Sequence, residues 1–192
     1  MIAIVKYNAG NIRSVQNALN RLSYNNTITD DPEMLKKADK VIFPGVGEAS
    51  TAMRYLKEKG LDELIPELKQ PVLGICLGLQ LMCQYSEEGN TKCLGIFDSV
   101  VKKFPAKEIV PHMGWNNFSE LKSPLFKGLQ VADNVYYVHS YFADISEQTI
   151  AVCNYIHPFS AALQKDNFYA TQFHPEKSAS VGELILKNFL EL

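Results

Sequence analysis

The sequence has few cysteines and no long hydrophobic run. Its four cysteines, Cys76, Cys83, Cys93 and Cys153, form no CxxC pair and no metal-finger spacing, which argues against a disulfide framework and a zinc site. The longest apolar stretches, such as 71–76, are far shorter than the ~20 residues that span a bilayer, and the first residues lack a basic leader. We therefore expect a cytoplasmic protein that binds no metal.

Basic residues are not in excess either. The 192 residues include 19 Lys and Arg against 21 Asp and Glu, a formal net charge of -2, without a basic stripe or tail. Nucleic acid is therefore not an expected partner. A hydrophobic content of 46% and a charged content of 21% fit one ordinary globular domain, and we expect residues 1–192 to form it.

Short apolar runs alternate with segments of helical period in the first half. In turn they lie at 2–5, 12–22, 41–43, 52–56, 72–75 and 79–83. Buried strands between amphipathic helices are typical of a parallel sheet covered on both faces. This pattern predicts an α/β domain.

Strand-like segments follow one another in the second half. They lie at 100–104, 112–118, 135–138, 150–155, 160–164 and 168–172, with an irregular insertion at 105–111. Strands in direct succession predict antiparallel strands attached to the parallel core. The helical period of 181–192 predicts a closing helix, with Ser178 or Ser180 as its cap.

A sharp turn is predicted where the strand at 72–75 meets the next helix. Cys76 lies there between Gly74 and Gly78, in the cysteine form of a nucleophile elbow. The glycines let strand and helix approach closely around a strained residue. The helix N-terminus favours a thiolate on Cys76, and the Leu77 N–H would face a developing oxyanion. Cys76 is a candidate nucleophile, although structural cysteines also occur in such glycine corners.

A candidate base and its orienting carboxylate follow the last predicted strand. His174, Pro175 and Glu176 lie at the carboxyl end of that strand, where α/β folds place their sites. A cysteine nucleophile needs an imidazole to share its proton, and the imidazole needs a carboxylate on its other nitrogen. The segment alone is a weak motif, but together with the elbow it predicts a Cys-His-Glu triad.

The other three histidines have no acidic neighbour at short range. We expect structural hydrogen-bonding roles for His112 and His157. His139 adjoins Ser140 and Tyr141 and is a candidate for the pocket wall.

With both motifs, the sequence resembles the class I glutamine amidotransferases, and among them the glutaminase subunits of the imidazole glycerol phosphate synthases of histidine biosynthesis. The elbow at 74–80 and the segment 172–178 are shared by many amidotransferases. The Pro-Gly-Val-Gly segment at 44–47 and the Pro-His-Met-Gly-Trp-Asn segment at 111–116 indicate this branch. The likeness runs from end to end and includes 8–11 and 138–141.

The resemblance implies a flavodoxin-like α/β fold and hydrolysis of L-glutamine to glutamate and ammonia without a cofactor. Cys76 would attack the side-chain amide to form a glutamyl thioester, and His174, oriented by Glu176, would protonate the leaving ammonia. A peptide reorientation beside the nucleophile would present a second N–H to the oxyanion. The matching oxyanion positions are Gly45, Val46, Gly47 and Leu77.

Two further sets of residues take their roles from the resemblance alone. The positions that would hold the polar ends of glutamine are Gln80, Glu88, Ser140 and Tyr141, with Glu88 chosen over Glu87 by the family. The positions near the partner are Asn11, Met113, Trp115, Tyr136 and Lys177. That partner would be a (β/α)8-barrel cyclase that forms a heterodimer with this chain and receives ammonia through the barrel. Trp115 is either a partner anchor or a core residue.

Three alternative functions are weighed against this interpretation. Glutaminases of anthranilate, guanylate or pyridoxal phosphate synthesis are disfavoured by the segment 111–116. A scaffold protein without turnover is disfavoured by the intact triad, although the glycine-flanked Val46 predicts low activity until a loaded cyclase reorients the peptide. A peptidase-like cysteine hydrolase would be distinguished by peptide or γ-glutamyl substrates.

Overall fold

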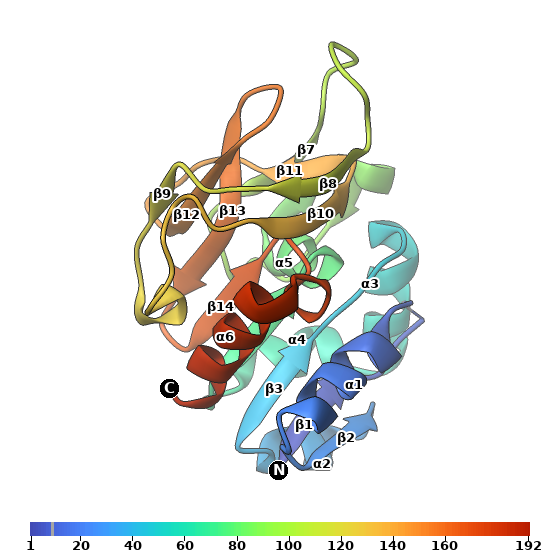
Figure 1. Ribbon diagram of the computed structural model, residues 1–192. Helices are drawn as coiled ribbons and strands as arrows, with labels where there is room; N and C mark the ends of the chain where they lie inside the picture. Colours follow the sequence, from blue (N-terminus) through green and yellow to red (C-terminus); the bar gives the residue numbers. More distant parts are fainter. Residues whose placement is uncertain (9) are drawn as a thin grey trace.

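A central mixed sheet with helices on both faces organises the molecule. Figure 1 shows the computed structural model, which describes residues 1–8 and 10–192. Ala9, which belongs to the 8–11 motif, lies outside the described residues. The eight-stranded sheet has the order β2-β1-β3-β4-β14-β13-β12-β9.

The first half forms the predicted parallel part of this sheet. Its strands β1 (Ile2–Val5), β2 (Asn26–Thr29), β3 (Lys40–Phe43) and β4 (Val72–Ile75) are parallel. The intervening helices are α1 (Ile12–Arg21), α2 (Pro32–Lys37), α3 (Ala49–Glu58), α4 (Leu61–Glu67) and α5 (Leu77–Met82). The sequence patterns had predicted neither β2, α2 nor α4.

Alternate residues of each strand enter two different cores. Ala3 and Val5 pack with helices α2 to α5, whereas Ile2 and Ile4 pack with α1 and the last helix, α6 (Ala179–Leu190). In Figure 1, α1 and α6 lie in front of the sheet. Strands buried on both faces are fully apolar, which explains the short apolar runs. The predicted α/β class is confirmed.

The second half is made mainly of strands. They are β5 (Tyr85–Ser86), β6 (Thr91–Lys92), β7 (Val100–Lys103), β8 (His112–Asn116), β9 (Glu120–Leu121), β10 (Val135–His139), β11 (Tyr141–Ala143), β12 (Thr149–Asn154), β13 (Pro158–Lys165) and β14 (Phe168–Thr171). Three short 3-10 helices are η1 (Glu88–Asn90), η2 (Pro124–Phe126) and η3 (Pro175–Lys177). No helix of the described residues has the length and apolar character to cross a membrane.

The predicted antiparallel pairing holds for β12 with β13, for β8 with β10 and for β7 with β11. β14 pairs antiparallel with β13 and parallel with β4, so it attaches the antiparallel strands to the parallel core as the sequence predicts. The hairpin with β13 reverses the chain, so β14 enters the central sheet in the direction of the nucleophile strand. The carboxyl ends of β4 and β14 therefore lie side by side, with Thr171 opposite Ile75.

Candidate active site

Cys76 occupies a strained turn between β4 and α5. Its φ is 54°, a left-handed conformation that is unfavourable for a residue with a side chain, and only 6% of its surface is exposed. Gly78 makes the turn possible, since a Cβ at this position would lie 1.8 Å from the Phe43 carbonyl oxygen. The sequence motif therefore corresponds to a close contact between α5 and β3.

His174 and Glu176 form a buried pair at the end of the neighbouring strand. His174 Nδ1 lies 2.8 Å from Glu176 Oε1, and both side chains are almost wholly buried. Burial lowers the pKa of His174, but the negative charges of the Cys76 thiolate and Glu176 outweigh it and raise this pKa to about 10. Within residues 1–8 and 10–192, His174 Nε2 has no hydrogen-bond partner, so it is free to exchange a proton with the nucleophile.

Three further residues hold this pair in place. The Asn11 side-chain amide donates to Glu176 Oε1 and lies 3.5 Å from His174 Nδ1. The Ser178 hydroxyl donates to the His174 carbonyl oxygen at 2.7 Å and accepts from the Tyr136 N–H. Ser178 does occupy the N-cap position of α6, but its side chain makes no cap hydrogen bond, because its hydroxyl is engaged with His174 and Tyr136.

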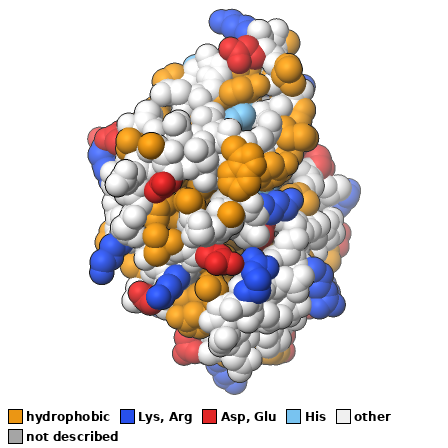
Figure 2. Space-filling model, viewed as in Figure 1, with side chains coloured by type: hydrophobic (Ala, Val, Ile, Leu, Met, Phe, Trp, Pro, Cys, Tyr) orange, Lys and Arg blue, Asp and Glu red, His pale blue; other side chains and the backbone are white. Residues whose placement is uncertain are grey.

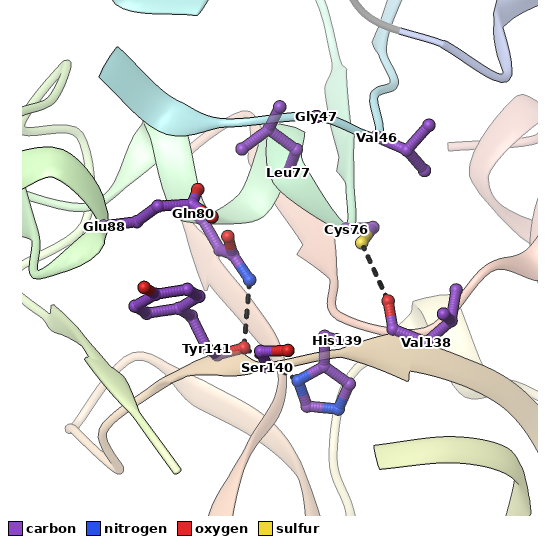
Figure 3. Close-up of a pocket in the computed structure, with 10 residues that line it drawn as sticks. All are labelled: Val46, Gly47, Cys76, Leu77, Gln80, Glu88, Val138, His139, Ser140 and Tyr141. Carbon is purple, nitrogen blue, oxygen red and sulfur yellow. Dashed lines mark hydrogen bonds between the residues drawn. The ribbon is translucent and has the colours of Figure 1, made fainter. Parts of the chain in front are cut away.

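A cavity of about 140 Å³ opens beside Cys76 (Figure 3). Its lining consists of Val46, Gly47, Cys76, Leu77, Gln80, Glu88, Val138, His139, Ser140 and Tyr141. It brings together all four residues expected to hold substrate, and three of the four oxyanion positions. His139 lines it as expected, and Glu88 lies in the wall whereas Glu87 accepts a hydrogen bond from the Lys103 N–H outside it.

Charged and polar groups both line this cavity. Glu88 accepts a hydrogen bond from the Ala49 N–H, and burial together with Glu48 raises the pKa of its carboxyl group. Next to Glu88 in Figure 3, Gln80 Nε2 donates to the Tyr141 carbonyl oxygen at 3.0 Å. The cavity therefore offers a carboxylate for an ammonium group and an amide-lined wall for a polar chain.

One of the expected oxyanion donors is already occupied. The Leu77 N–H donates to the Gly45 carbonyl oxygen at 3.2 Å, and the Val46 carbonyl oxygen accepts from the Gly10 N–H at 3.0 Å. An oxyanion beside Cys76 could receive the Leu77 hydrogen bond only after the Gly45–Val46 peptide had turned. Gly47, with a φ of 145°, adopts a conformation that favours glycine next to this peptide.

Comparisons with known proteins identify the family of this chain. The model of the class-I glutamine amidotransferase family matches residues 4–192. The imidazole glycerol phosphate synthase subunit HisH of Bacteroides fragilis is 66% identical over 194 residues, which cover 100% of this chain and 99% of the relative. The chain belongs to the class I glutamine amidotransferases, in the branch of the HisH subunits. The HisH subunit of Haemophilus influenzae is 47% identical, covering 99% of this chain and 96% of the relative.

Solved structures share the fold of this amidotransferase. A protein from Thermoplasma acidophilum, described as belonging to a GMP synthase, has a TM-score of 0.77 at 22% identity and covers 100% of this chain and 92% of its own. A structure described as a glutamine amidotransferase has a TM-score of 0.77 at 18% identity, covering 100% and 98%. At such low identities, the structural likeness shows the fold alone. It confirms the predicted class I amidotransferase fold.

Four of the five residues expected near a partner of this amidotransferase lie close together on the surface, on β8, β10 and η3. Met113 and Trp115 are 63% and 55% exposed, so Trp115 is not a core residue. The Trp115 ring meets the Tyr136 ring edge-on at 6.0 Å, and Lys177 Nζ lies 6.0 Å from the same Tyr136 ring. Figure 2 shows hydrophobic side chains gathered on this face, over β8 and β10. The fifth residue, Asn11, lies against Glu176 instead.

Two buried histidines form a hydrogen-bonded chain below the cavity wall. The Asn116 amide donates to His112 Nε2, so His112 Nδ1 must donate to His139 Nε2 at 3.0 Å. His139 Nδ1 then donates to the Tyr141 carbonyl oxygen at 2.7 Å. Burial lowers the pKa of His112 to about 4 and that of His139 to about 3. Both rings are therefore neutral in the folded protein near pH 7.

This pair predicts a loss of stability in mild acid. Below pH ~6.5 the unfolded chain protonates both histidines whereas the folded chain does not, so acid favours unfolding down to pH ~4. We expect the free energy of unfolding, measured in urea, to be about 3 kcal/mol lower at pH 5 than at pH 6.5.

A matched pair of variants isolates the contribution of the buried histidines. His139→Asn should reduce the dependence of the unfolding free energy on pH by about half, since one of the two groups no longer titrates. Asn188→Leu, which removes a buried amide and no titratable group, should leave it unchanged. An unfolding free energy that is constant between pH 6.5 and pH 5 would contradict the assignment.

Proposed function

We propose that this chain is the glutaminase subunit of an imidazole glycerol phosphate synthase in histidine biosynthesis. It hydrolyses L-glutamine to glutamate and ammonia, and a (β/α)8-barrel cyclase uses the ammonia to form imidazole glycerol phosphate and the aminoimidazole carboxamide ribonucleotide. The observation that carries the proposal is the elbow cysteine at a cavity beside a buried His174–Glu176 pair. The 66% identity to a HisH subunit over the full chain supports this pathway above other glutaminases.

The triad supplies the proton transfers of a thioester mechanism. The Cys76 thiol gives its proton to His174 Nε2, and the thiolate attacks the side-chain amide carbon of glutamine. The protonated His174 then gives that proton to the leaving nitrogen, the C–N bond breaks and ammonia departs. His174 next takes a proton from water, whose oxygen attacks the thioester, and glutamate and the thiol are released. Glu176 keeps the imidazole oriented with Nε2 toward the sulfur.

The occupied Leu77 N–H supports control by the partner. In the state described, the Gly45 carbonyl oxygen takes the hydrogen bond that an oxyanion would need. A turn of the Gly45–Val46 peptide would free the Leu77 N–H and direct the Val46 N–H to the same point. We infer that a loaded cyclase binds the turned state of the Gly45–Val46 peptide more tightly than the unturned state. Only such a difference in binding can shift the equilibrium toward the turned state.

The cavity wall provides the contacts that free glutamine requires. A free amino acid carries an ammonium and a carboxylate, which need partners of opposite charge or suitable hydrogen bonds. Glu88 would receive the ammonium, and Ser140 and Tyr141 would contact the carboxylate end. The hydrogens of Gln80 Nε2 are directed to protein oxygens, so Gln80 would offer its carbonyl oxygen to the substrate.

The exposed surface around Trp115 is the proposed cyclase interface in a heterodimer. Aromatic and apolar side chains that remain exposed are frequent anchors of protein contacts. Tyr136, which packs against Trp115, accepts a hydrogen bond from the His174 N–H through its carbonyl oxygen, so the interface adjoins the triad. Asn11, which donates to Glu176, would link the interface to the triad.

We take residues 1–192 to act as one domain in the cytoplasm.

The decisive experiment measures glutamate release by the pure chain alone, with its cognate cyclase, and with cyclase plus the nucleotide ligand. Formation of an oxyanion site predicts that the loaded complex is about 100-fold or more faster than the free chain. Equal rates in all three conditions would exclude the proposed control. A cyclase that neither binds nor stimulates would indicate a glutaminase of another pathway, and turnover of peptides in place of glutamine would indicate a peptidase.

A further inference from the structure

We propose that Gln172 is a further catalytic residue, whose side-chain amide stabilises the Cys76 thiolate. The proposal rests on the proposed function, since it assigns a role within the same site. Gln172 Nε2 lies 3.7 Å from Cys76 Sγ, within the range of a hydrogen bond from nitrogen to sulfur. The side chain is fully buried and follows β14, the strand that pairs with the nucleophile strand β4.

The orientation of the Gln172 amide is fixed by Gln80. Gln80 Nε2 donates to Gln172 Oε1 at 3.1 Å and to the Tyr141 carbonyl oxygen at 3.0 Å, which engages both of its hydrogens. If the Gln172 amide were reversed, its NH2 group would face the NH2 group of Gln80 and its oxygen would face the sulfur. Both contacts would leave buried polar groups unsatisfied. The donor Nε2 is therefore the atom directed at Cys76.

The surroundings of Cys76 Sγ distinguish a thiol from a thiolate. The sulfur lies 3.9 Å from the Val138 carbonyl oxygen, an acceptor that a thiol can donate to and that repels a thiolate. Apart from His174, which takes the proton, Gln172 is the one side-chain donor that reaches the sulfur among the residues the structure describes. Loss of the thiol proton therefore removes the contact with Val138 and strengthens the contact with Gln172.

Gln172 acts in this scheme without transferring a proton. The proton of Cys76 moves to His174 Nε2, and Gln172 keeps both of its own while donating one hydrogen bond to the negative sulfur. When the sulfur attacks glutamine and the thioester forms, the charge leaves the sulfur and this hydrogen bond weakens. Gln172 thus raises the fraction of Cys76 that is present as the thiolate. A hydrogen bond to a charged group changes the equilibrium between thiol and thiolate about 10-fold or more.

The test is the rate at which iodoacetamide alkylates Cys76 in the free chain at pH 7, followed by mass spectrometry of the Cys76 peptide. Burial raises the pKa of Cys93 to about 12 and that of Cys153 to about 11, so these thiols react slowly. We expect Gln172→Met, which lacks the donor, to be alkylated about 10-fold more slowly than the parent. Gln172→Glu keeps the volume and the acceptor for Gln80 but removes the amide donor, and it should be slowed at least as much.

Asn188→Leu is the matched control, because it removes another buried amide, one that donates to the Leu125 and Lys127 carbonyl oxygens and not to the sulfur. It should lower stability and leave the alkylation rate unchanged. A folded Gln172 variant alkylated within about twofold of the parent rate would overturn the proposal. The assay needs neither glutamine nor cyclase, so it gives a result even if the parent chain proves to have no glutaminase activity.

Discussion

Cys76→Ala is expected to lower glutamine-dependent turnover of the cyclase-bound chain about 10⁴-fold or more. The loss is large because the thioester route is removed outright, and triad residues act as a unit whose single loss forfeits most of the acceleration. Glutamate release measures the effect directly. The cyclase reaction supplied with an ammonium salt should continue at the parent rate, because the proposed division of labour assigns only ammonia formation to this chain.

Cys153→Ala provides the control for this prediction. Cys153 is fully buried in β12, and it lies outside the cavity lining. Its replacement removes a sulfur from the core and should lower stability slightly without slowing turnover. Glutamate release by Cys76→Ala at the parent rate would show that another residue is the nucleophile.

Gly78→Ala is expected to be the more damaging change to the fold. The new Cβ would lie 1.8 Å from the Phe43 carbonyl oxygen, a backbone atom that cannot turn aside, so α5 and β3 must separate. We expect a loss of about 3 kcal/mol or more in the free energy of unfolding, measured in urea. Displacement of α5 also moves Cys76, and a shift of about 1 Å in a nucleophile can cost about 100-fold in turnover.

Gly60→Ala separates this steric effect from the general cost of replacing glycine. No atom lies within 4 Å of a Cβ at position 60, and the φ there is 65°, so only conformational strain is added. We expect a loss of about 1 kcal/mol and unchanged glutamine turnover. If Gly78→Ala unfolds no more easily than Gly60→Ala, then α5 and β3 are not held in the close contact described.

Sequence patterns identified the elements whose signals are local. The apolar runs of β1, β3 and β4 and the helical periods of α1 and α3 were visible because buried strands and amphipathic helices have different periods. The short elements β2, α2 and α4 were missed. β2 is only partly buried and α2 has a single buried residue, so neither has a strong apolar pattern.

The roles of several site residues were beyond the reach of sequence patterns. Gln172 stood within a recognised motif without a role, because the direction of its amide depends on Gln80 from another element. Asn11 was expected at the partner surface and lies against Glu176. Ser178, one of the two serines predicted as the cap of α6, occupies the N-cap position without a side-chain cap hydrogen bond. Each role depends on contacts between residues far apart in the chain, and such contacts leave no periodic pattern in a single sequence.

By itself, the sequence determined the α/β class, the sharp turn that carries Cys76, and the resemblance that names a triad. These follow from local rules: the alternation of apolar segments, the need for glycine where backbones meet, and the pairing of a histidine with a nearby carboxylate. Only the tertiary structure decided that β14 runs parallel to β4 and so brings His174 to Cys76. It also decided that Leu77 is engaged by Gly45 and that Gln172 faces the sulfur, because strand direction and hydrogen-bond partners are fixed by packing across the whole chain.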